Sequence, residues 1–186
     1  IYDHGYIGAF SAIKHWDLSE QIIETTYYFT TSYVRNRDDR IGSFQYKIKT
    51  ITEKKIFGLK PLWFGSKKVY ISDPTKTIVD LLDDPKLVGG MTVLYDIYSE
   101  YIDSEYCDYK KMLDYIERMN NKTIYKRLGF MLETKLGMIP GPLKEIEKKI
   151  SLGYTLFDTL LPSDSIVEKW MLKVPTSWKK EYDRKK

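Results

Sequence analysis

Few side chains in this sequence have the types and spacing that catalysis requires. The sequence contains two histidines, His4 and His15, and one cysteine, Cys107. A zinc site of the usual spacing needs more Cys and His ligands, and a serine or cysteine nucleophile would need one of the two histidines as its base. We place His15 at the end of a short helix beside Trp16, which favours a structural role. Because phosphate-binding glycine loops and nucleophile-elbow motifs are also missing from the sequence, we expect no metal site, no cofactor and no enzymatic activity.

Glu133 and Lys135 have the one spacing that resembles a catalytic motif. Metal-dependent nucleases of the restriction-enzyme type use a Glu-x-Lys pair, in which the carboxylate holds Mg²⁺ and the lysine stabilises the scissile phosphate. Those enzymes place the pair on a strand, whereas the apolar spacing over 121–136 predicts a helix here. Side chains two apart on a helix do not face each other. A magnesium-dependent nuclease is therefore the less favoured alternative.

Positive charge is the more abundant chemical resource. Candidates for contact with nucleic-acid phosphates or a partner are Arg35, Arg37, Arg40, Lys122, Lys126 and Arg127. The three arginines between 35 and 40 occupy a polar, loop-like segment that also contains Asp38 and Asp39, so pairing within the loop competes with phosphate contact. Lys122 and Lys126 are four apart and share a face of the predicted helix. Phosphate contact and simple solvation both stay open at these positions.

The charges are distributed unevenly along the chain. Residues 1–71 have a net charge of +4, residues 72–108 of −7, residues 109–150 of +5 and residues 151–186 of +2. An acidic middle between basic flanks can steer charged partners, although charge runs are usually solvated surfaces. A nucleic-acid-binding module that acts through the basic flanks is therefore an alternative function.

The composition predicts one folded domain. The 186 residues are 42% hydrophobic and 15% aromatic, which suits a chain with a core. No run approaches the roughly 18 apolar residues of a membrane span, and the start does not resemble a signal peptide. With a single cysteine, the chain suits a reducing compartment, so we expect a cytoplasmic protein without a membrane partner.

Hydrophobic periodicity predicts an α+β fold. We expect strands in the N-terminal third and again near the C-terminus, forming a mixed or antiparallel sheet packed against about five helices. The expected elements are a helix at 5–16, strands at 25–31 and 43–49, a hairpin at 62–71 turning at Gly65-Ser66, helices from Asp73-Pro74 to 150, and strands at 154–161 and 168–174. Residues 1–176 would form the domain and 177–186 a charged tail that frays.

Five pairs of motifs occur in order along nearly the whole chain. They are residues 6–12 with 16–21, 53–59 with 69–80, 84–85 with 89–90, 121–122 with 126–133, and 153–162 with 170–174. Together they resemble the C-terminal domain of the AbiEi family of antitoxins and transcriptional regulators. The charged residues in these motifs add Lys76 to Lys122, Lys126 and Arg127 as candidate functional residues, while Gly129 in mid-helix predicts a close backbone contact.

The resemblance implies a bacterial, non-catalytic antitoxin and transcriptional-regulator effector domain of a type IV abortive-infection toxin–antitoxin system. Its functional partner would be a nucleotidyltransferase-like toxin, countered without a stable complex. Members of the family usually carry an N-terminal winged helix that binds operator DNA. Because residues 1–20 leave no room for one, we expect it to be absent and operator recognition to require a winged helix supplied separately.

Overall fold

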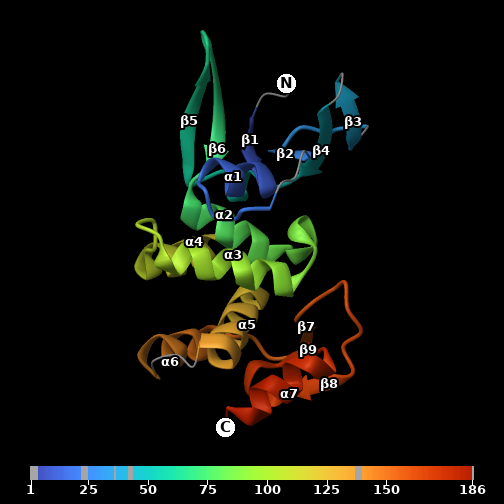
Figure 1. Ribbon diagram of the computed structural model, residues 1–186, viewed down its shortest axis with the longest axis vertical. Coiled ribbons are helices and arrows are strands. Elements are labelled where there is room, and N and C mark those ends of the chain that lie inside the picture. Colours follow the sequence, from blue (N-terminus) through green and yellow to red (C-terminus); the bar gives the residue numbers. More distant parts are fainter. Residues whose placement is uncertain (1–3, 22–24, 36, 42–43, 137–139, 186) are drawn as a thin grey trace. The chain divides into compact units, whose positions relative to one another are not determined.

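A computed structural model describes residues 4–21, 25–35, 37–41, 44–136 and 140–185, and the side chains at 39–41, 44, 136 and 140–142 are not described. The chain divides into two compact units (Figure 1). The first unit comprises residues 1–81 and 96–119, and the second comprises 82–95 and 120–186. The α+β class is confirmed, but the expected single domain did not anticipate this division.

The first unit contains a six-stranded mixed sheet in the order β3-β4-β2-β1-β6-β5. The strands are β1 (Gly5–Gly8), β2 (Thr25–Thr30), β3 (Asp38–Ile41), β4 (Phe44–Thr50), β5 (Leu59–Phe64) and β6 (Lys67–Ser72). β1 runs antiparallel to β2 and parallel to β6, while β2 runs parallel to β4. Strands β5 and β6 form the predicted hairpin with its turn at Gly65-Ser66.

Helices and short helical turns lie between these strands and after them along the chain. They are α1 (Phe10–His15), the 3-10 turn η1 (Glu53–Lys55), α2 (Pro74–Asp83), the 3-10 turn η2 (Pro85–Val88), α3 (Met91–Asp103) and α4 (Tyr109–Met119). The start of α2 is as the sequence predicts: Asp73 Oδ1 accepts the Lys76 backbone N–H at 2.8 Å, and Pro74 occupies the first helical position. In the core, the rings of Tyr6 and Phe29 stack with their centroids 5.0 Å apart.

The second unit combines helices with a small sheet of its own. It contains the end of α2, the turn η2 and the start of α3. Its other elements are α5 (Lys122–Met131), the π-helical turn η3 (Leu132–Leu136), α6 (Pro140–Lys149), β7 (Thr155–Leu156), β8 (Ser165–Val167), η4 (Glu168–Trp170), β9 (Leu172–Val174) and α7 (Thr176–Arg184). A Cβ at Gly129 would overlap the Trp170 indole, so the predicted close contact is confirmed. Rings of Phe130, Phe157, Trp178 and Tyr182 pack beside it.

Several expected elements were wrong. The C-terminal strands do not extend the N-terminal sheet but form a separate three-stranded sheet in the order β7-β9-β8. The expected tail is helix α7, which buries Trp178 and Tyr182, four residues apart on one face. The expected helix at 5–16 begins as strand β1, and the expected loop at 35–40 contains part of strand β3.

Candidate nucleic-acid interface

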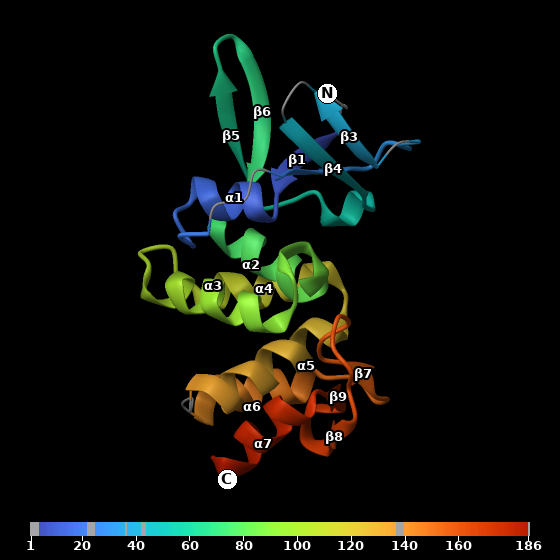
Figure 2. The same cartoon turned by 45° about the vertical axis from the view of Figure 1, so that its right-hand side comes forward.

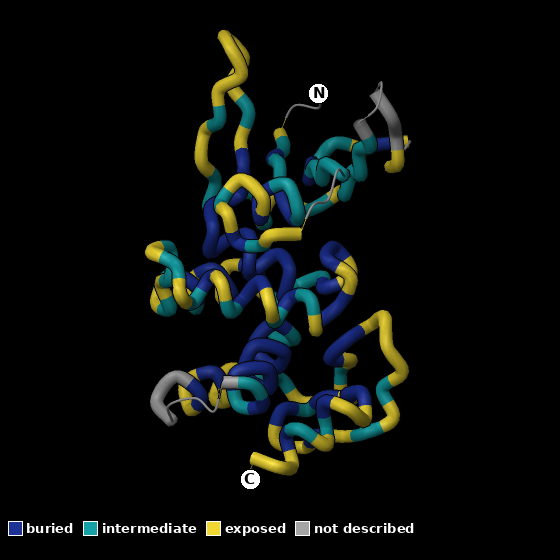
Figure 3. The backbone as a smooth tube through the Cα atoms, in the orientation of Figure 1, coloured by how far each residue is buried: buried dark blue, intermediate teal, exposed yellow. Residues whose placement is uncertain are grey.

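The β5–β6 hairpin projects from the rest of its unit, as both views show (Figures 1 and 2). Its outer part is mostly exposed, and burial increases toward its root at Ile71 and Ser72 (Figure 3). The tight turn places Gly65 at a φ of 60°, a conformation that glycine adopts without strain. A projecting two-stranded element of this kind can reach a ligand that the body of the unit does not contact.

The hairpin lies in a strongly basic stretch of the chain. Between Glu53 and Asp73 the sequence contains five lysines and no Asp or Glu. Three of these lysines, at positions 60, 67 and 68, are exposed on the hairpin itself. The nearest carboxylates in the sequence are Glu53 in η1 and Asp73 directly before α2, so the two strands of the hairpin carry lysines and no carboxylate of their own.

Large aromatic side chains are interleaved with these lysines. Trp63, Phe64 and Tyr70 are 63%, 59% and 40% exposed. The strand register pairs Trp63 with Lys68 and therefore places both on one face of the hairpin. The Lys68 ammonium lies 5.9 Å from the Trp63 ring centroid and 4.9 Å from that of Tyr70. Trp63, Lys68 and Tyr70 thus form a continuous row, which we call the stacking row.

The opposite face differs in chemistry. Phe64 pairs with Lys67, and Leu62 pairs with Val69, so this face carries one exposed aromatic ring, the exposed lysines at 60 and 67, and half-buried aliphatic side chains. Lysines bind phosphates and exposed rings stack on bases, which together make a surface suited to nucleic acid.

Hydrogen bonds fix the root of the hairpin. Trp16 Nε1 donates to the Ser72 carbonyl at 2.7 Å, and the Ser72 hydroxyl lies 2.8 Å from that of Thr77 in α2. The next backbone N–H, that of Asp73, donates to the Gly58 carbonyl just before β5 at 2.8 Å. The hairpin is therefore tied at both strands to the helix that follows it.

The carboxylate of Asp73 completes this root. Its Oδ2 accepts a hydrogen bond from the Tyr115 hydroxyl at 2.9 Å and lies 2.8 Å from the Lys111 ammonium. Burial, together with this bond to a carboxylate, raises the pKa of Tyr115. A pocket of about 570 Å³ adjoins the root, lined by both Lys60 of β5 and Asp73.

Lys76 is placed differently from the sequence-based expectation. Its side chain is fully buried, and its ammonium pairs with Asp80 and donates to the Tyr6 hydroxyl at 3.1 Å. Tyr6 in turn donates to the other Asp80 oxygen at 2.9 Å. We therefore correct the assignment of Lys76 to partner contact, because its charge is neutralised inside the first unit.

The same correction applies to two residues of α5 in the second unit. The Arg127 guanidinium donates to four backbone carbonyls, those of Leu82, Asp83, Leu156 and Phe157, at 2.8–3.2 Å. The buried Lys126 ammonium donates to the Gly153 carbonyl at 2.6 Å, and burial lowers its pKa. Arg127 joins the end of α2 to β7 and the residue after it, Lys126 holds the loop at Gly153, and both cations are engaged within the second unit.

The remaining predicted cations are more accessible. Arg35 and Arg37 are exposed in the first unit, and the side chain of Arg40 on β3 lies outside the described residues. Lys122, at the start of α5, is half-buried with its ammonium 5.4 Å from the Tyr125 ring centroid. The structure does not bring the seven predicted residues together into one surface.

Glu133 and Lys135 do not converge on a common site. Glu133 accepts a hydrogen bond from Trp170 Nε1 at 2.6 Å, whereas Lys135 pairs with Glu181 of α7. Within the described parts of the chain, no group of three His, Cys, Asp or Glu side chains could hold a metal ion. His15 ends α1 and meets the Trp16 ring edge-on at 4.6 Å.

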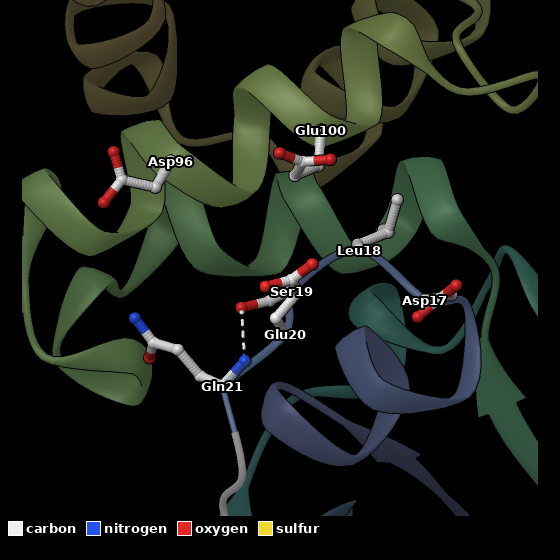
Figure 4. Close-up of a pocket in the computed structure, with 7 residues that line it drawn as sticks. All are labelled: Asp17, Leu18, Ser19, Glu20, Gln21, Asp96 and Glu100. Atoms are coloured by element: carbon white, nitrogen blue, oxygen red, sulfur yellow. Dashed lines mark hydrogen bonds between the residues drawn. The ribbon is translucent and has the colours of Figure 1, made fainter.

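An acidic pocket of about 460 Å³ is a second concave feature of the first unit (Figure 4). It is lined by the carboxylates of Asp17, Glu20, Asp96 and Glu100. Asp17 and Asp96 lie at opposite ends of the view and do not point toward one another. Such a surface repels phosphates, so the hairpin is the candidate for nucleic-acid contact.

The sequence predicted the hairpin, but its exposed side chains were not among the candidate functional residues. The missed residues are Lys60, Trp63, Lys67, Lys68 and Tyr70. The available signal was a run of 19 residues, 54–72, that contains lysines and aromatics without a single carboxylate.

No protein-family model matches this sequence, and no curated protein shows a significant match to it. In the parts of the chain that the structure describes, none of the helices combines the length and apolar character needed to cross a membrane.

Proposed function

We propose that this chain is a nucleic-acid-binding regulatory module that contacts its ligand through the β5–β6 hairpin. The observation that carries the proposal is the exposed row of Trp63, Lys68 and Tyr70 on a carboxylate-free hairpin. Lys60 and Lys67 add two further exposed charges to the same element. Exposed aromatic surface is usually kept small in the absence of a ligand, so its concentration here indicates a binding site.

The biological setting that we propose rests on the sequence resemblance. We place the chain in the bacterial cytoplasm as a non-catalytic antitoxin and transcriptional-regulator effector, opposing a nucleotidyltransferase-like toxin without a stable complex. The support is the ordered set of AbiEi-like motifs. The hairpin supplies the physical means by which such an effector would contact nucleic acid.

Binding through lysines is tested by its salt dependence. Three phosphate contacts give a slope of log K against log salt of about −2.1 to −2.7. Affinity for a labelled oligonucleotide should thus fall roughly 20- to 40-fold between 50 and 200 mM salt. In a variant with Lys60, Lys67 and Lys68 changed to Gln, we expect most of this slope to disappear.

A matched variant controls for the loss of overall charge. Lys144, Lys148 and Lys180 are also exposed, lie in the second unit, and can be changed to Gln with the same change in net charge. Unchanged binding by this control, with binding lost in the hairpin variant, supports the assignment. Equal losses in both variants, or no binding by the wild-type chain at low salt, would overturn it.

The antitoxin role needs a cellular assay. The chain is co-expressed with a nucleotidyltransferase-like toxin, and growth is followed with the wild type and the hairpin variant. Rescue by the wild type supports the proposed setting. Failure to rescue, including with a winged helix fused to the chain, rejects that setting while leaving the binding result intact.

A further inference from the structure

We infer that the ligand of the hairpin is a single-stranded nucleic acid whose unpaired bases stack on Trp63 and Tyr70 while Lys68 binds the phosphate between them. This inference rests on the proposed function and specifies its ligand. Cross-strand pairing joins Trp63 to Lys68, and Tyr70 follows Lys68 by two residues on the same strand and face. Side chains two apart on a strand are about 6.6 Å apart, so Lys68 lies between the two rings, opposite Trp63 across the strands and next to Tyr70 along β6.

Both rings of the stacking row are accessible to a ligand. Trp63 and Tyr70 retain 63% and 40% of their surface in solvent, so neither ring is part of the core. The Lys68 ammonium lies 4.9 Å from the Tyr70 centroid, a typical cation–π distance. The row therefore offers aromatic surface and a positive charge side by side on an accessible face.

A duplex and an unpaired strand present different groups to the hairpin. In a duplex the faces of the bases are stacked on each other, so lysines can reach the phosphates but rings cannot stack on bases. An unpaired strand exposes base faces as well as phosphates, and aromatic rings then add binding energy at each base. The alternation of ring and cation in the stacking row matches that ligand and exceeds what phosphate contact alone requires.

Phe64 provides an internal control. It is adjacent to Trp63 and similarly exposed, at 59%, but the strand alternation places it on the opposite face beside Lys67. Stacking on the row requires Trp63 and not Phe64. A hairpin that inserts its tip into a lipid surface would instead use both rings, because both lie next to the turn.

Binding to a labelled oligothymidylate of about 12 nucleotides and to an equal-length duplex is measured by fluorescence anisotropy. Binding to vesicles of phosphatidylserine and phosphatidylcholine is measured in parallel. Trp63→Ala and Tyr70→Ala should each weaken single-strand binding about tenfold, with the salt slope unchanged. Trp63→Tyr should restore most of the affinity, and Phe64→Ala should leave it near wild type. Lys68→Gln should reduce the salt slope by about 0.7.

Each other outcome overturns the inference. Equal affinity for duplex and single strand, with no effect of Trp63→Ala, leaves the lysine-based proposed function standing but removes stacking. Equal losses from Trp63→Ala and Phe64→Ala show that the rings act without a preferred face. Binding to the vesicles alone, lost in both ring variants, assigns the hairpin to lipid and rejects both proposals. Thermal unfolding of each variant confirms that the exposed substitutions leave the fold intact.

Discussion

Replacing Arg127 by lysine should destabilise the second unit although the positive charge is kept. The guanidinium is 5% exposed and donates to four backbone carbonyls that come from two separate segments, residues 82–83 and 156–157. A lysine ammonium is a compact donor that cannot span both segments as the planar guanidinium does. If two of the four bonds are lost, at about 1.5 kcal/mol each for a charged donor, the free energy of unfolding falls by about 3 kcal/mol.

For a chain of this length, that loss corresponds to a decrease in Tm of roughly 10 °C. The assay is urea and thermal unfolding followed by tryptophan fluorescence in a Trp16→Phe, Trp63→Phe background. In this background Trp170 and Trp178 report the second unit. Arg37→Lys, at an exposed position, is the matched control and should change stability by less than about 0.5 kcal/mol. An Arg127→Lys variant as stable as this control would refute the role of the guanidinium fork.

Two further predictions concern the first unit. Lys76→Met leaves the buried Asp80 carboxylate without its cation and should lower the free energy of unfolding by about 3–5 kcal/mol; adding Asp80→Leu should recover most of the loss, and chemical denaturation of both variants measures it. Stability should also fall as pH rises above 10, the ordinary pKa of tyrosine, because burial raises the pKa of Tyr101 and Tyr115 and the unfolded chain loses these protons first. Urea midpoints at pH 9 and 11 check this, and a Tyr101→Phe, Tyr115→Phe variant with an undiminished decrease would contradict it.

The sequence predicted those elements that a few neighbouring residues determine. The hairpin was predictable because Gly65-Ser66 separates two strand-like segments, and the start of α2 was predictable from the Asp73-Pro74 pair. Helix α7 carried a usable signal that was overlooked: Trp178 and Tyr182 are four apart within an otherwise charged segment. Strands β7 and β9 lie within the predicted strands at 154–161 and 168–174, but they have only two and three residues, so both predicted strands were too long.

The positions of the buried cations could not be predicted in the same way. Lys76 is four residues from Asp80, a spacing that is common on exposed helix surfaces, and only the contact with Tyr6, 70 positions away, shows that the pair is internal. Arg127 binds carbonyls 29 to 45 positions away. A sequence reveals that a residue is charged, but whether water or distant backbone solvates that charge depends on tertiary structure.

The carboxylate-free hairpin has a consequence for the kinetics of binding. Because its lysines project from the unit without neighbouring carboxylates in their own strands, their attraction on a polyanion begins before contact and is screened over about 10 Å at 0.1 M salt. The association rate should therefore decrease with salt. The dissociation rate should depend instead on the rings of Trp63 and Tyr70, whose contacts form only after the ligand has arrived. Capture and retention of the ligand are thus assigned to different side chains of a single 14-residue element.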